Sequence, residues 1–104
     1  MNNEIFGKVD EEEEVFVSDE AHFKHECAYQ SVRTISLKNG TITLDTEAWA
    51  NGENTTSSAR RGVKKGEVKY ITSLINGAFD APLYVRIECI KYLMHLYFNI
   101  EVSQ

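Results

Sequence analysis

The sequence predicts an α+β domain in which an N-terminal antiparallel sheet, centred on an Asn39-Gly40 hairpin, packs on a C-terminal pair of helices. Apolar and polar residues alternate over 33–38 and 41–45 around Asn39-Gly40, which is the strongest short hairpin signal. Residues 67–76 and 81–98 follow the helical period instead. The 104 residues have the usual length of one domain with its own core. We divide 1–104 into an acidic sheet-rich half (1–50), a polar and basic connector (51–66) and a helical half (67–104).

The first thirty residues carry weaker signals. Residues 5–9 and 15–17 are short apolar segments typical of strands, and the acidic run 10–14 separates them as a solvated turn or as a surface for a basic groove. Ser18-Asp19-Glu20 offers a helix start, so we favour a helix over 19–30. Its alternating apolar residues fit a strand as well, and the alternative stays open.

In the hairpin, a two-residue turn places opposite each other the positions whose numbers sum to 79. One face is then apolar and packs on a core, and the other is polar and faces water. The apolar pairs are Leu37 with Ile42 and Ile35 with Leu44, and the polar pairs are Ser36 with Thr43 and Thr34 with Asp45. If the strand continues to Trp49, that residue has the parity of the polar face, and it serves either as core or as an interface anchor.

Residues 51–58 contain no large apolar side chain, which is typical of an exposed connector. Four bases follow within six positions: Arg60, Arg61, Lys64 and Lys65. They indicate either a flexible basic loop or a contact with an anion or a partner.

Two helices complete the expected fold. The first covers 67–76 and ends at Gly77, and Phe79 plugs the short junction to the second. The second covers 81–98, with Asp80 as its cap, and its apolar residues span about 220°, roughly twice the stripe of a surface helix. That width requires either wrapping by the rest of the chain or contact with a partner. Arg86 lies within this apolar sector, so it must extend to solvent, pair with an acid from the first half or contact a partner, and we favour the pair.

The sequence contains only weak metal-binding or catalytic motifs. His22, His25, Glu26 and Cys27 form a small ligand-like cluster, of which a helix would place His22, His25 and Glu26 on one face. Zinc sites take three or four ligands and the next histidine is His95, so the cluster supports at most a minor metal or enzyme hypothesis, in which His22, His25 and Cys27 would act. The sequence has no nucleophile, phosphate-loop or dinucleotide signature, so we expect neither enzyme activity nor a cofactor. Cys27 and Cys89 are expected as free thiols. With no signal peptide and with charges in 81–98, we expect a cytoplasmic protein without membrane contact.

Charge distribution suggests how the chain acts. Residues 1–53 hold twelve acids and four bases, whereas 54–104 hold four acids and seven bases. We therefore predict an inhibitor of immunity-protein or antitoxin type that binds a basic partner such as a nuclease toxin. A phage inhibitor of host defence is one alternative, and a nucleic-acid module using the four bases is another. A homodimer is compatible with each of these three functions. The predicted partner-binding residues are Glu11, Glu12, Glu13, Glu14, Asp45, Glu47 and Trp49.

Overall fold

The computed structural model describes residues 14–19, 29–50 and 52–101. Within them the chain forms a four-stranded antiparallel sheet and then two helices, which confirms the predicted α+β class. The elements are β1 (Val15–Ser18), β2 (Tyr29–Lys38), β3 (Thr41–Ala50), β4 (Glu53–Gly62), the 3₁₀ helix η2 (Lys65–Glu67), α2 (Val68–Ala78) and α3 (Leu83–Phe98).

The hairpin between β2 and β3 has the predicted register. Leu37 lies opposite Ile42, and Ile35 lies opposite Leu44. Asn39 and Gly40 both have positive φ, 53° and 75°, as a type I′ turn requires. The sheet order is β1-β2-β3-β4, so that β1 and β4 are its two edges.

The connector predicted over 51–66 is the main error. Residues 53–62 form β4, which pairs along its full length with β3 from Glu53 opposite Ala50 to Gly62 opposite Thr41. The sheet therefore extends beyond the expected acidic half. The predicted helix over 19–30 is also wrong at its end, because Tyr29 and Gln30 belong to β2. Residues 20–28 and the predicted strand at 5–9 lie outside the described residues, whereas the strand predicted at 15–17 is confirmed as β1.

Both helices differ from the prediction at their ends. α2 continues through Gly77 to Ala78, and Gly77 is not a left-handed cap. α3 begins after Pro82, and the Asp80 side chain makes no cap hydrogen bond. At its end, Asn99 is left-handed (φ 58°), and the N–H groups of Asn99 and Ile100 both donate to the Met94 carbonyl, the latter at 3.1 Å. A left-handed residue thus ends the helix. No helix in the described part of the chain is long and apolar enough to cross a membrane.

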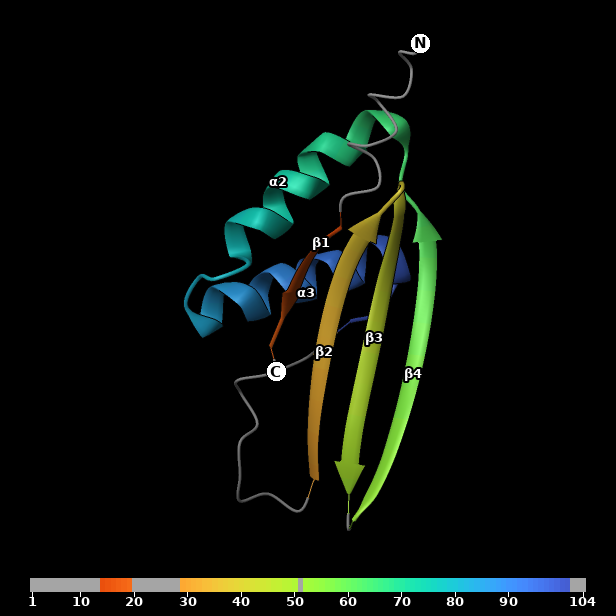
Figure 1. Ribbon diagram of the computed structural model, residues 1–104, viewed down its shortest axis with the longest axis vertical. Coiled ribbons are helices and arrows are strands. Elements are labelled where there is room, and N and C mark those ends of the chain that lie inside the picture. Colours follow the sequence, from red (N-terminus) through yellow and green to blue (C-terminus); the bar gives the residue numbers. More distant parts are fainter. Residues whose placement is uncertain (1–13, 20–28, 51, 102–104) are drawn as a thin grey trace.

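The helices lie on one face of the sheet and cover the half of it that is nearest the β2–β3 turn (Figure 1). There α2 packs on β1 and α3, and α3 also contacts β2 and β4. The buried core is shared by both layers and consists of Val17, Ile35, Leu37, Ile42, Leu44, Val63, Ile71, Ile75, Ala78, Cys89, Ile90, Leu93, Met94 and Phe98. The wide apolar sector predicted for α3 is thus mostly covered within the chain, although Leu96 remains 48% exposed.

Among the described residues, Arg86 bonds to carbonyl oxygens and not to an acid of the kind that the sequence suggested. Its Nε donates to the Ala81 carbonyl and its Nη1 donates to the Ser18 carbonyl, both at 3.0 Å. Carbonyl oxygens therefore satisfy the guanidinium, and the bond to Ser18 ties the start of α3 to the end of β1. Phe79 does not plug the helix junction, because it is 49% exposed and packs edge-to-face on Phe16, with 5.1 Å between ring centroids.

Candidate functional site

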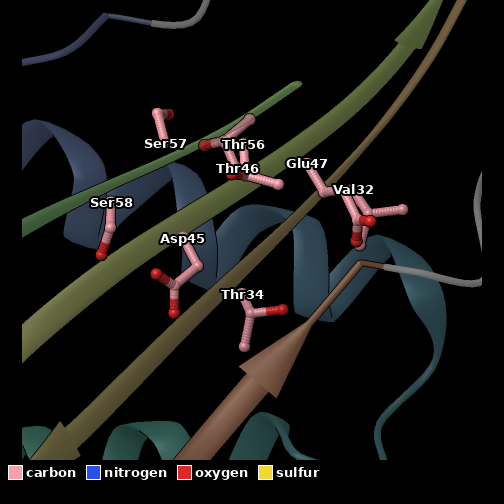
Figure 2. A pocket seen from close by; sticks show the side chains of 8 residues that line it. All are labelled: Val32, Thr34, Asp45, Thr46, Glu47, Thr56, Ser57 and Ser58. Carbon is pink, nitrogen blue, oxygen red and sulfur yellow. The ribbon is translucent and has the colours of Figure 1, made fainter. Parts of the chain in front are cut away.

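The face of the sheet opposite the helices, here called the open face, carries the candidate site. Side chains alternate along a strand, so the residues between the core positions of β2, β3 and β4 point to this face. The register aligns them in rows across the strands: Thr34, Asp45 and Ser58 form one, and Val32, Glu47 and Thr56 form the next. A shallow cleft of about 490 Å³ lies at this part of the sheet, as Figure 2 shows, lined by Val32, Thr34, Asp45, Thr46, Glu47, Thr56, Ser57 and Ser58. Thr46 and Ser57 have the parity of the helix side, and the other six residues have that of the open face.

Two carboxylates dominate the electrostatics of this cleft. Asp45 and Glu47 are two residues apart on β3, so their Cα atoms are separated by roughly 7 Å. Asp45 is exposed, and no described residue forms an ion pair with it. The Glu47 carboxylate accepts a long hydrogen bond (3.3 Å) from the Asn54 amide, and no base lines the cleft. Within the described part of the chain, the cleft therefore presents two negative charges among hydroxyl groups and without a neighbouring base.

Asp45 and Glu47, two of the predicted partner-binding residues, thus lie on one surface. Trp49 is the next residue of the same parity in β3, opposite Gln30 and Asn54, but its side chain lies outside the described part. Glu14 is exposed just before β1. Glu11, Glu12 and Glu13 lie outside the described residues, and so do His22, His25 and Cys27.

The four bases predicted as one anion site do not point to one surface. Arg60 and Arg61 are neighbours in β4 and therefore project to opposite faces. Arg61 lies over the Phe98 ring of α3, 5.3 Å from its centroid, and its Nη1 donates to the Arg60 carbonyl (2.7 Å). Lys64 and Lys65 follow in the loop and in η2. Arg60 shares the open face with Lys38, at the end near the β2–β3 turn, so this face is basic at one end and acidic towards the other.

A second cleft, of about 650 Å³, lies between the β2–β3 turn and α2. Its apolar floor includes the buried side chains of Leu37 and Val63, and Lys38, Lys65 and Lys69 stand among its lining residues. No pattern along the chain indicates this arrangement, since its lining comes from β1, β2, η2 and α2 and requires the folded structure.

Sequence reasoning also missed the contact between Asp19 and Arg33. Asp19 is 1% exposed, and its Oδ1 accepts the Arg33 N–H (2.7 Å) while its own N–H donates to the Arg33 carbonyl (3.1 Å). The carboxylate thus replaces a strand carbonyl and extends the β1–β2 ladder by one residue. Its Oδ2 lies 3.3 Å from Arg33 Nε, within ion-pair distance but without hydrogen-bond alignment. The role of this pair is to anchor β1.

Tyrosines gather where α2 and α3 meet. The Tyr97 hydroxyl donates to Glu67 Oε1 (2.8 Å), and burial together with this bond raises the pKa of Tyr97 to about 12. A hydrogen bond with Tyr70 raises the pKa of Tyr92. Tyr70 and Tyr92 are 55% and 44% exposed, so they form a polar aromatic surface above the helix packing.

The remaining reactive groups of the described residues can be placed one by one. They contain no group of three or more His, Cys, Asp or Glu side chains placed to hold a metal ion. Cys89 is a free thiol within the core, and burial raises its pKa, so the reactive thiolate is disfavoured. His95 Nδ1 lies 3.0 Å from the exposed Glu101 carboxylate and far along α3 from Cys89. The carboxylates and hydroxyls of the open face can accept hydrogen bonds from cationic groups.

Comparison with known proteins identified no matching family model, no matching curated protein and no matching solved structure.

Proposed function

We propose that this protein is a non-enzymatic inhibitor that binds a basic protein partner through the acidic end of its open face, with Asp45 and Glu47 as the central contacts. The observation that carries the proposal is the exposed Asp45 beside the half-buried Glu47, in a hydroxyl-lined cleft without a base in its lining. A partner bearing Lys or Arg side chains supplies the missing charge. A nuclease has such residues in the groove that holds its nucleic acid, so covering that groove would inhibit it.

The rigid sheet supports this role. Asp45 and Glu47 lie in a central strand that is paired on both sides, with Thr34 and Val32 of β2 on one side and Ser58 and Thr56 of β4 on the other. Side chains on such a strand lose little further backbone entropy on binding, which favours affinity. The basic end of the same face at Lys38 and Arg60 repels a uniformly basic partner and so favours one orientation.

The separation of Arg60 from Arg61 weighs against the nucleic-acid alternative, because phosphate binding by this segment would need both guanidinium groups on one surface. Immunity to a toxin and inhibition of a host defence nuclease would use the same surface. They differ in the partner and not in the chemistry of binding.

The experiment measures association with a panel of purified basic nucleases, at low and at physiological salt, and tests inhibition of cleavage by each nuclease that binds. We expect one of them to bind and to be inhibited, with an association rate that falls as salt rises. Asp45→Asn with Glu47→Gln should slow association by roughly tenfold. Both side chains are on the surface, so the free energy of unfolding should change by less than about 0.5 kcal/mol.

The matched control is Glu88→Gln with Glu101→Gln, which also removes two exposed carboxylates, one from α3 and one from the segment that follows it. It should leave the association rate unchanged. The proposal would be overturned if the chain binds no nuclease in the panel, or if Asp45→Asn with Glu47→Gln associates as fast as the control. A mobility shift with DNA or RNA that persists in Asp45→Asn with Glu47→Gln would favour the nucleic-acid alternative.

A further inference from the structure

β4 is a long edge strand with a free side. It runs ten residues from Glu53 to Gly62 and is exposed at every position except Ala59, and among the described strands it pairs only with β3. The opposite edge, β1, has only four residues. An edge of this length presents a row of backbone N–H and C=O groups that can pair with another strand.

The hairpins establish which residues of β4 point outward. Lys38 and Thr41 close a two-residue turn and therefore exchange backbone hydrogen bonds. Because the direction of the backbone N–H and C=O groups alternates along a strand, those of the odd-numbered residues of β3 point to β2 and those of the even-numbered residues point to β4. Their partners in β4 are the odd-numbered residues, in agreement with the bond from Val63 N–H to the Gly40 carbonyl (2.8 Å). The backbone groups of Asn54, Thr56, Ser58 and Arg60 thus face the free side. The Arg60 carbonyl is accordingly reached by the Arg61 side chain.

This edge is complementary to itself. In an antiparallel pair of two β4 strands centred on Ser57, Asn54 lies opposite Arg60 and Thr56 opposite Ser58, so that outward groups meet outward groups. The same register places Glu53 of each copy opposite Arg61 of the other, on the helix side of the sheet. Opposite charges directly across a pair of strands stabilise it. If the register of the two β4 strands shifts by two residues in one direction, Arg61 lies opposite Thr55 instead of Glu53. If it shifts by two in the other direction, Arg61 lies beyond the start of the partner strand. Only the Ser57-centred register therefore pairs both charges.

The arrangement of layers permits this pairing. Antiparallel pairing of identical edges requires a two-fold axis perpendicular to the sheet, so the helices of both copies lie on the same side. The helices cover the end of the sheet near the β2–β3 turn and leave the other end free (Figure 1). Antiparallel strands place the covered end of one copy beside the free end of its partner, and the two helical layers therefore do not collide.

We infer that two copies of this chain associate through their β4 edges into a continuous eight-stranded antiparallel sheet, with the Glu53–Arg61 pairs selecting the register. The interface is narrow and consists mostly of backbone bonds and hydroxyl side chains. It therefore forms a weak dimer that dissociates on dilution. This inference is independent of the partner proposed above, because it rests on the edge of the sheet and not on its open face.

The first experiment is sedimentation velocity of the purified chain over a wide concentration range, with the variant Thr56→Pro. We expect a monomer–dimer equilibrium for the native sequence and a monomer at every concentration for the variant. The Thr56 N–H points outward, so proline removes no bond within the sheet and the variant should fold. Its circular dichroism and unfolding temperature verify this. A native chain that stays monomeric, or a folded Thr56→Pro variant that dimerises equally, would overturn the inference.

The second experiment tests the register by charge exchange. Glu53→Arg and Arg61→Glu each place like charges opposite each other, so each variant alone should dimerise at least about tenfold more weakly. When the two variants are mixed in equal amounts, one copy contributes a base at both positions and the other contributes an acid at both. Each cross-strand pair then joins opposite charges again, and dimerisation should return to nearly the native level.

Lys69→Glu, a charge reversal of the same size on α2, should leave dimerisation unchanged. A mixture that stays monomeric while the native chain dimerises would overturn the Ser57-centred register.

Discussion

Tyr97 and Glu67 show how one hydrogen bond joins two helical elements. Tyr97 lies in the last turn of α3 and Glu67 at the end of η2, thirty positions away, and their side chains meet at 2.8 Å. Burial disfavours the phenolate, and the neighbouring carboxylate both accepts the hydroxyl proton and repels the negative charge, so the pKa of Tyr97 rises from 10.0 to about 12. The folded state therefore favours the neutral phenol more strongly than the unfolded chain does.

This pair predicts a loss of stability at high pH. Because the folded pKa lies above the unfolded one, the contribution of Tyr97 is complete below pH 10 and disappears as the pH rises towards 12. In Glu67→Gln the charge is lost but burial remains, so the pKa of Tyr97 should fall while staying above its ordinary value. NMR titration of isotope-labelled tyrosine measures both values, with Glu88→Gln as the control. An unchanged Tyr97 pKa in Glu67→Gln would show that Glu67 has no part in the shift.

Among the elements, the β2–β3 hairpin was predictable and β4 was not. Asn39-Gly40 and the alternation of Ile35, Leu37, Ile42 and Leu44 specify turn, register and faces together, which also placed Asp45 on the polar side. β4 has no such alternation, because it lies at an edge where Ala59 is its one apolar residue that packs on the core. Its backbone bonds to β3 hold it in place, and a pattern of side chains does not report them. The cleft lined by β2, β3 and β4 could not be predicted for the same reason, because it requires β4 to lie beside β3.

The turn of this hairpin gives a prediction for glycine. Gly40 has φ 75° with open space around its Cα, so Gly40→Ala should destabilise by about 1 kcal/mol through backbone strain alone. Gly62 also has open space but lacks a positive φ, and Gly62→Ala should leave stability unchanged or slightly raise it. Urea denaturation of the two variants makes the comparison. Equal losses would show that conformation at the turn is not the cause.

On the scale of the whole molecule, one core joins two layers of different origin in the sequence. The sheet contributes Val17, Ile35, Leu37, Ile42 and Leu44, and the helices contribute a set that includes Ile71, Ile75, Ile90 and Leu93. Neither layer can bury its apolar face without the other. The other face of the sheet stays polar and carries Asp45 and Glu47. The acidic first half and the basic second half of the sequence therefore belong to one folded unit and are not separate domains.

A single shared core predicts cooperative unfolding. Leu93 is fully buried at the interface of the layers, and Leu93→Ala should cost about 2–5 kcal/mol because it leaves a cavity. Leu96, only three residues along α3 but 48% exposed, should lose less than about 1 kcal/mol on the same change. Trp49 fluorescence follows the sheet and far-ultraviolet circular dichroism follows the helices. Both signals should change at one denaturant midpoint, which moves down by the same amount in Leu93→Ala. If only the helical signal moved, the sheet would be stable without α3, and the two layers would have to be treated as separate folding units.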